Sequence, residues 1–433
     1  MYPNLYYAFQ DLFGIELPFL RIVNTFGFFV AISFLVAATL LSRELKRKTR
    51  EGLMQYTEET IEVGRPASIA DLLINFFAGF VLGYKLGGII VGGSEALQDP
   101  PAYLMSGEGN LPIGLLLGGL LAFWKWWEKR KQQLPKPEKR AVRIWPYDRV
   151  GEFTLLALIF GILGAKLFDI FENWSDFLKH PAAYLLSPAG LTFYGGLICA
   201  TIAIILYARK HKISIRHLAD AIAPALMAAY AVGRIGCQVA GDGDWGIYNT
   251  AYTLDANQKI VAAQPGDFER TVAANTGYFA RRWDDSASIQ KANFPKPGAL
   301  SFMPDWFFAY NYPRNVNEDG TPLRACNDDK YCMGLPQPVF PTPLYEVIMG
   351  GALFFLLWGL RKRLKPYGAV FCLYLIVNGL ERFTIELIRV NNRMDFLGLR
   401  PTQAEVIAVG LILTGTGLWI YLSKKNSASP AKL

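Results

Sequence analysis

Two arginines lie inside apolar runs that are long enough to form membrane helices. Arg234 stands in AAYAVGRIGCQVAGDGDWG, residues 228–246, and Arg382 stands in NGLERFTIELIR, residues 378–389. Placing an arginine at bilayer depth costs roughly 2.5 to 3.5 kcal/mol on insertion scales, so such a residue rarely lacks an ion-pair partner or a functional role. A planar guanidinium binds phosphate through two parallel hydrogen bonds. We therefore interpret the pair as an anion-binding site.

Further charged residues follow Arg382 at helical spacing. Glu386 is four residues after it and Arg389 is three residues after Glu386, so the sequence predicts that all three line one helical face. They could serve the site, or they could form a self-neutralising stripe of ion pairs that only holds helices together.

The remaining candidates lie near the same ends of their predicted helices. At 1.5 Å per residue, Arg234 is roughly 9 Å and Arg382 roughly 12 Å from the outer ends of their spans. One shared site in the outer half of the membrane is therefore expected. Its other candidate members are Lys166, Tyr194, Gly195, Gly196, Gly233, Asp242, Asp244, Gly246, Tyr345 and Glu346.

Structural roles remain open for several of these residues. The Gly195–Gly196 pair could serve close helix packing, and Asp242 and Asp244 could form a turn at a helix end. Lys166 could extend toward the membrane boundary.

The composition indicates an all-α polytopic integral membrane protein. Of 433 residues, 52% are hydrophobic, and they fall in runs of about 20, enough to cross a bilayer core. The net charge of +8 comes from basic residues beside these runs, which argues against nucleic acid as a partner. The sequence predicts nine spans, at about 20–41, 71–93, 112–127, 151–172, 190–208, 219–240, 343–361, 367–390 and 404–423.

Basic residues alternate between successive connections. Sequences such as RELKRKTR, KWWEKRKQQLPKPEKRAVR and RKHKISIRH follow odd-numbered spans, whereas residues 94–111 contain no Lys or Arg. Because basic loops stay in the cytoplasm, the N-terminus is expected outside and the C-terminus inside. The chain is then a single membrane domain, 1–433, with one long external segment at 241–342.

The external segment contains two cysteines, Cys326 and Cys332, in CNDDKYC. We expect a short disulfide, because an external loop permits one. Free thiols or a metal are the alternatives, and the lack of histidine in this segment weakens the metal alternative. The sequence contains no motif for a metal or a cofactor, and neither is predicted.

An internal repeat covers two predicted helix pairs. LLINFFAGFVLGYKLGG near 72–88 is similar to LLALIFGILGAKLFD near 155–169, and residues 113–131 are similar to 192–210. Tyr194 precedes the paired glycines of the second copy, where the first copy has Leu117. A duplicated hairpin, with 71–131 as the extra copy, is one interpretation. Shared glycine-rich composition is the other.

These motifs together resemble one enzyme family. GRIGCQVAGDGDWG resembles the signature of bacterial phosphatidylglycerol:prolipoprotein diacylglyceryl transferases, and the resemblance runs from about residue 15 to 423. Further segments that resemble this family are GAKL at 164–167, LTFYGGL at 191–197, LYE at 344–346, RFTIELIR at 382–389 and TQAE at 402–405. The family has seven spans, so the hairpin at about 71–127 and the long external segment are departures.

The resemblance implies a reaction and its partners. The diacylglyceryl group of phosphatidylglycerol would pass to the lipobox cysteine in a prolipoprotein signal peptide, giving a thioether and releasing glycerol phosphate. The enzyme would lie in the bacterial inner membrane, with its active site toward the periplasm.

The resemblance also implies site roles. Arg234 and Arg382 match the family's essential arginines, and Glu386 and Arg389 match their acidic and basic followers. Tyr194 stands where many members have histidine, which leaves the general base open, with Glu386 or Asp242 as the acceptor of the thiol proton. Cys237 stands where many members have asparagine.

Two other classes of function remain open at this point. The same arginines could line the path of a transporter or channel for an anionic solute. The chain could also be a lipid-binding membrane protein without catalysis.

Overall fold

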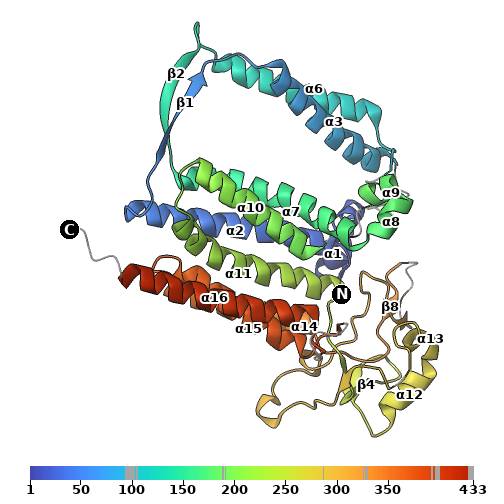
Figure 1. Cartoon of the computed structure of the whole chain (residues 1–433). Coiled ribbons are helices and arrows are strands. Elements are labelled where there is room, and N and C mark those ends of the chain that lie inside the picture. Colours follow the sequence, from blue (N-terminus) through green and yellow to red (C-terminus); the bar gives the residue numbers. More distant parts are fainter. Residues whose placement is uncertain are drawn as a thin grey trace. The chain divides into compact units, whose positions relative to one another are not determined.

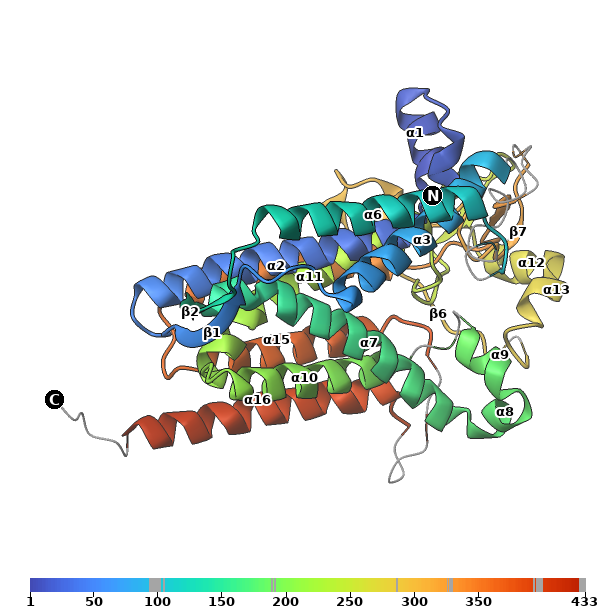
Figure 2. The same cartoon turned by 90° about the horizontal axis from the view of Figure 1, so that it is seen from above.

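The computed structural model describes residues 1–92, 103, 106–187, 190, 192–285, 287–324, 326, 330–391, 394 and 400–427 (Figures 1 and 2). The chain forms two compact units. Unit 1 comprises Met1–Ala8, Val23–Leu41 and Arg216–Leu433, and unit 2 comprises Phe9–Ile22 and Ser42–Ile215. Helices α1 (Leu5–Phe13) and α2 (Thr25–Arg50) run from one unit into the other.

Unit 1 contains four long helices and the polar segment between two of them. Its long helices besides the first part of α2 are α11 (Ile215–Ala240), α14 (Thr342–Leu360), α15 (Ala369–Glu386) and α16 (Gln403–Ser427). The short elements between α11 and α14 are β3 (Tyr248–Asn249), β4 (Tyr252–Leu254), β5 (Ile260–Ala262), α12 (Asp267–Ala274), α13 (Thr276–Phe279), β6 (Lys291–Ala292), η3 (Gly298–Leu300), η4 (Asp305–Phe307), β7 (Thr321–Pro322) and β8 (Met333–Gly334).

Unit 2 is built from two helix hairpins and a β-ribbon. α3 pairs with α6, α7 pairs with α10, and β1 pairs with β2 along seven antiparallel residue pairs from Thr57↔Ile144 to Val63↔Glu138 (Figure 1). Its elements are η1 (Pro18–Ile22), β1 (Thr57–Val63), α3 (Ile69–Gly92), α6 (Leu111–Lys131), β2 (Glu138–Ile144), η2 (Pro146–Arg149), α7 (Val150–Glu172), α8 (Trp174–Lys179), α9 (Pro181–Leu186) and α10 (Phe193–Lys210).

The described chain has a helix at each range where the sequence predicts a span. Within the described residues, six stretches are long and apolar enough to cross a membrane, as expected for a polytopic membrane protein: Thr25–Arg50, Ile69–Ile89, Pro146–Glu172, Ile215–Ala240, Thr342–Leu360 and Gln403–Lys425. The count of nine spans and the orientation of the termini stay predictions.

Two expectations about the fold were wrong in detail. The chain is mostly helical rather than all-α, because the polar connections form strands, of which β1 and β2 are the longest. The basic stretch after the first span is not a loop, because α2 continues to Arg50. Arg47 forms ion pairs with Glu44 and Glu51, and such pairs at i,i+3 and i,i+4 spacing favour helix.

A buried aspartate fixes the start of α15, the helix that carries Arg382. Asp220 on α11 accepts hydrogen bonds from the backbone N–H groups of Gly368 at 2.7 Å and Val370 at 3.1 Å. These N–H groups have no partner within their own helix, so a carboxylate there both satisfies and orients them. α15 is thereby held in place against α11.

The segment between α11 and α14 has an aromatic core of its own. Its buried residues are Trp245, Tyr248, Phe268, Tyr278, Phe279, Ile289, Tyr312, Leu335 and Val339. The segment is joined to α11 by a hydrogen bond from Val316 N to Ala240 O at 3.0 Å. The composition, with its many polar residues, did not indicate this core.

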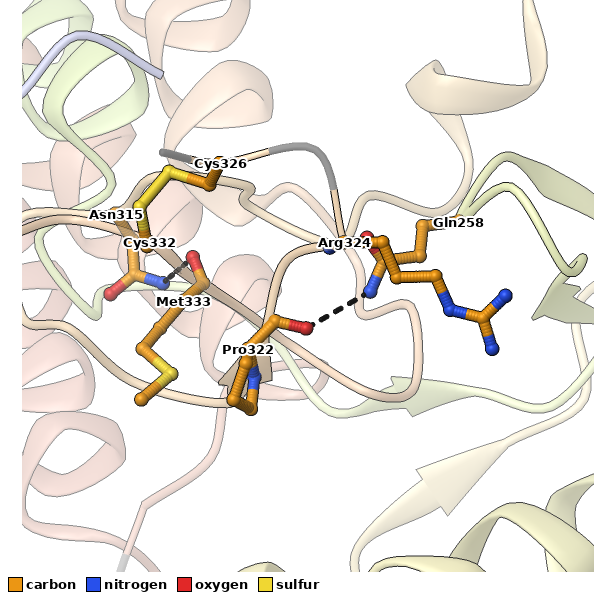
Figure 3. The surroundings of a disulfide bond; sticks show 7 residues. All are labelled: Gln258, Asn315, Pro322, Arg324, Cys326, Cys332 and Met333. Carbon is orange, nitrogen blue, oxygen red and sulfur yellow. Dashed lines mark hydrogen bonds between the residues drawn. A yellow bond between two sulfur atoms is a disulfide. The ribbon is translucent and has the colours of Figure 1, made fainter. Parts of the chain in front are cut away.

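The predicted disulfide between Cys326 and Cys332 is confirmed, with their Cα atoms 5.6 Å apart (Figure 3). Close to it, Asn315 Nδ2 donates to Met333 O at 3.4 Å, and Gln258 Nε2 donates to Pro322 O at 3.3 Å. The bridge therefore belongs to a loop that is also held by side-chain hydrogen bonds.

The two hairpins of unit 2 begin their second helices in the same way. Asn110 N donates to Tyr84 O at 2.8 Å, and Thr192 N donates to Ala165 O at 3.1 Å. Tyr84 and Ala165 each precede the lysine of the matching GYKL and GAKL motifs.

Close backbone approach is also repeated in the two hairpins. A Cβ on Gly83 would lie 2.6 Å from Ile113 O, and one on Gly164 would lie 2.5 Å from Gly195 O. These paired contacts support the duplication. They also correct its register, because Tyr194 then corresponds to Pro112 rather than to Leu117.

Candidate active site

A carboxylate joins two arginines in unit 1. Asp244 accepts a hydrogen bond from Arg234 on one oxygen and from Arg389 on the other. Arg234 lies on α11, and Arg389 lies beyond the end of α15. The two guanidinium groups therefore converge on one small anion, which here is a side chain of the protein.

Glu346, on α14, lies among three arginines and is fully buried. Its Oε2 atom is 3.3 Å from Arg234 Nε, and its Oε1 atom is 3.7 Å from a guanidinium nitrogen of both Arg382 and Arg389. Residues distant in sequence thus meet in one charged cluster. We call Arg234, Asp244, Glu346, Arg382, Glu386 and Arg389 the arginine cluster.

Arg382 and Glu386 pair along α15 as their spacing predicts. Arg382 Nη2 lies 3.1 Å from Glu386 Oε2, and Asn391 Nδ2 donates to Glu386 Oε1 at 2.5 Å. The expectation that Arg389 continues the same helical face was wrong. α15 ends at Glu386, and Arg389 instead forms a β-bridge with Gly246, which turns its side chain toward Asp244.

The glycines of the signature differ in their surroundings. A Cβ on Gly246 would lie 2.5 Å from Ile388 O and 2.9 Å from Phe340 Cβ, so this glycine lets two segments approach each other. A Cβ on Gly233 would meet nothing within 4 Å. Gly246 therefore has a packing role here, whereas Gly233 leaves open space one residue before Arg234.

Asp242 follows the end of α11 and borders the cluster. Burial raises the pKa of its carboxyl group, and the negative charge of Asp244 raises this pKa further. A carboxylate with a raised pKa binds a proton more readily, so Asp242 is suited to accept one.

Cys237 and the two aspartates bring possible metal ligands within 4.8 Å of one another. Arg234 Nη1 lies 3.7 Å from Cys237 Sγ, and Arg234 is also paired with Asp244. A fixed positive charge at this distance disfavours a metal cation. We therefore do not assign a metal site to these three residues.

Tyr345 contacts the segment between α11 and α14. Its hydroxyl donates to Phe307 O at 2.6 Å, and its ring packs against that of Phe307. In this structure it anchors the segment to the start of α14.

Four predicted site residues belong to unit 2. Lys166 lies 3.7 Å from Asp169 and 4.6 Å from the centre of the Tyr184 ring. Tyr194 is the second residue of α10.

Both glycines that follow Tyr194 face α7. A Cβ on Gly195 would lie 2.5 Å from Gly164 O, and one on Gly196 would lie 2.7 Å from Gly161 O. Close packing between α10 and α7 therefore accounts for both glycines.

Two residues at the arginine cluster, the partly buried Tyr230 and the buried Glu381, were not among the predicted ones. Tyr230 places its ring 5.4 Å from the guanidinium carbon of Arg234, and Glu381 is only 2% exposed. Tyr230 is four residues before Arg234, so helical spacing could have indicated it. Glu381 adjoins Arg382 in sequence, but adjacent helical residues point in different directions, so only the packing of three helices reveals its role.

The fold and this cluster define a class of protein. The described part of the chain is mostly helical, with six candidate membrane spans. It holds three converging guanidinium groups around carboxylates, which is an arrangement suited to an anionic headgroup. The family described as prolipoprotein diacylglyceryl transferase matches residues 113–421. The chain belongs to this family.

The matched range contains every predicted site residue and omits α3. Similar proteins include the phosphatidylglycerol–prolipoprotein diacylglyceryl transferase of Paraburkholderia xenovorans, 26% identical over 298 residues, which cover 67% of this chain and 83% of the relative. The protein of the same name from Burkholderia multivorans is 25% identical over 299 residues, which cover 67% of this chain and 84% of the relative.

Proposed function

We propose that this protein transfers the diacylglyceryl group of phosphatidylglycerol to the lipobox cysteine of a prolipoprotein. The observation that carries the proposal is the convergence of Arg234, Arg382 and Arg389 on the buried carboxylate of Glu346 within the family-matched range. A lipid phosphate offers the same bidentate acceptor geometry as that carboxylate.

The chemistry follows from where charge develops. The cysteine sulfur attacks the glyceryl carbon, the carbon–oxygen bond to phosphate breaks, and the electron pair stays on the leaving phosphate. Fixed positive charge in a water-poor site stabilises that negative charge. The same charge favours the thiolate, since a free thiol with a pKa of about 8.5 is only slightly ionised at neutral pH.

The thiol proton needs an acceptor, and we propose a carboxylate for this role. Asp242 fits because burial raises the pKa of its carboxyl group. Glu386, held by Arg382 and Asn391, is the second candidate. Tyr194 takes part through its hydroxyl as a hydrogen-bond donor.

The proposal is tested with purified protein in phosphatidylglycerol vesicles and a synthetic lipobox peptide. The expected result is a peptide whose mass has grown by one diacylglyceryl group, together with free glycerol phosphate. A peptide with serine in place of the lipobox cysteine is the matched control and is expected to remain unmodified. Absence of a thioether product with the cysteine peptide would contradict the proposed function.

We further propose a single membrane domain of nine spans in the bacterial inner membrane. The N-terminus and the 241–342 segment then lie on the periplasmic side, as does the active site, and the C-terminus lies in the cytoplasm. The basic connections support this topology, and the disulfide between Cys326 and Cys332 suits an oxidising compartment. Residues 71–131 form the hairpin added to the family's seven spans.

Cysteine labelling of intact cells tests the topology. A membrane-impermeant thiol reagent is expected to label Ala280→Cys, an exposed position of the 241–342 segment, but not Gln133→Cys or Glu51→Cys, which are exposed on basic connections. All three are expected to react after the membrane is opened. Labelling at residues 51 and 133 but not at 280 in intact cells would reverse the topology and the predicted side of the site.

A further inference from the structure

The hydroxyl of Tyr230 lies between two buried carboxyl groups. Its oxygen is 3.0 Å from Glu346 Oε1 and 2.8 Å from Glu381 Oε1, so both contacts have hydrogen-bond length. A tyrosine hydroxyl has a single proton to donate. One contact can use that proton, and the other is a full hydrogen bond only if the carboxyl group supplies a proton of its own.

The surroundings indicate which carboxyl group carries the additional proton. Glu346 contacts three arginines. Glu381 forms no ion pair in the described part of the chain, and its Oε2 atom is buried without a hydrogen-bond partner there. Burial of an unpaired carboxylate is strongly disfavoured, and such a group binds a proton instead. The proton therefore belongs on Glu381.

The charges around Glu381 are consistent with this assignment. The nearby arginines, Arg234 and Arg382, are already paired with the carboxylates of the cluster. Ala408 and Ile412 are the residues of α16 that pack at Gly379, and neither is titratable. The charged or titratable side chains that face Glu381 are Tyr230 and Arg234 on α11, Glu346 on α14, and Tyr374 and Arg382 on α15.

We infer that Glu381 stores a proton that Tyr230 passes to Glu346 when the lipid phosphate gains its second negative charge. This inference rests on the proposed function. As the carbon–oxygen bond breaks, Glu381 protonates the Tyr230 oxygen while the Tyr230 proton moves to Glu346 Oε1. Glu381 becomes a carboxylate and Glu346 becomes neutral. The proton returns after glycerol phosphate leaves, so no further reactant is needed.

The transfer matters because Glu346 lies among the arginines that would hold the phosphate. An ionised Glu346 competes with the phosphate for the same guanidinium charge. Moving the negative charge from Glu346 to Glu381 frees the guanidinium groups for the phosphate dianion at the moment it forms. Glu381 thus acts on the site through Tyr230 and Glu346, as a positioning residue, and does not contact the lipid.

Infrared spectroscopy of the purified protein tests the stored proton without any assay of activity. The parent protein is expected to show the carbonyl stretching band of a buried, protonated carboxylic acid, and Glu381→Gln is expected to lose it. Glu62→Gln, which changes an exposed carboxylate of β1, is the control and should retain the band. A band that persists in Glu381→Gln would overturn the assignment.

Kinetics test the use of the proton. Glu381→Gln and Tyr230→Phe are each expected to lower kcat by about 100-fold, the lower range for a positioned acid or base, with little change in KM for phosphatidylglycerol. Because the parent needs a protonated Glu381, its activity should fall as pH rises through the titration of this group. Glu381→Gln should lack that fall. Tyr421→Phe, on an exposed position of α16, is the matched control and should behave like the parent.

These experiments separate the inference from the proposed function. If the parent forms no thioether product, the proposed function fails, and the infrared band still decides whether Glu381 is protonated. If the parent is active but both variants keep its kcat and pH profile, the inference alone is overturned. Loss of the band together with a lower kcat and a flattened profile supports it.

Discussion

Replacing Arg234 or Arg382 by alanine is expected to reduce diacylglyceryl transfer by at least about 100- to 1000-fold, the loss typical of removing one donor to a developing oxyanion. Each residue contributes a guanidinium group that contacts Glu346 and is close enough to share a phosphate. The remaining arginines cannot replace it, because bidentate binding needs a guanidinium plane in the correct position. Steady-state transfer to a lipobox peptide measures the effect.

A second consequence of the alanine variants must be separated from catalysis. Removing Arg234 leaves Glu346, which is fully buried, with only the more distant ion pairs at 3.7 Å. Loss of one partner of a buried pair commonly costs about 3 to 5 kcal/mol of stability. Arg234→Lys and Arg382→Lys keep the charge, so they should insert and purify normally while recovering only part of the rate.

Arg361→Ala is the matched control for these variants. Arg361 follows the last residue of α14 and packs over the Trp358 ring, so its removal should leave transfer unchanged. Transfer at the parent rate in either Arg234→Ala or Arg382→Ala would contradict a role of that arginine in phosphate binding.

The Tyr194→Phe variant is expected to slow transfer by about 10- to 1000-fold, the range for loss of one positioned donor. A tyrosine hydroxyl carries one proton, so it is poorly suited to remove the thiol proton but can donate a hydrogen bond to a phosphate or glycerol oxygen. Tyr194 lies in the first turn of α10, directly before the two glycines that pack on α7. Transfer rates from about pH 6 to about pH 9 measure the effect.

Two further substitutions at this position distinguish chemistry from anchoring. Tyr194→His should remain active, because either side chain can donate a hydrogen bond. Aromatic residues also gather at membrane boundaries for reasons unrelated to catalysis. If Tyr194→Phe matches the parent at every pH while Tyr194→Ala fails only through poor folding, the hydroxyl has no chemical role.

The sequence alone determined the helices and the charged pair that starts the site. An apolar run of about 20 residues must cross a membrane or be buried in protein, and each predicted span has a helix in the structure. Helix α2 continues to Arg50, beyond the predicted end of its span. Arg382 and Glu386 pair as predicted because the i,i+4 spacing is a local property of one helix. The cysteine pair was likewise predictable, because its members are only six positions apart in the sequence.

The tertiary structure alone decided which charges share the site. Arg389 leaves the α15 face because its backbone pairs with Gly246, a contact between segments more than 100 residues apart that no local pattern encodes. Tyr230 and Glu381 join the cluster only because α11, α14 and α15 pack together around a fully buried Glu346. Helical periodicity specifies which residues share one face, whereas the partner of a buried charge depends on the neighbouring helix that excludes water from it.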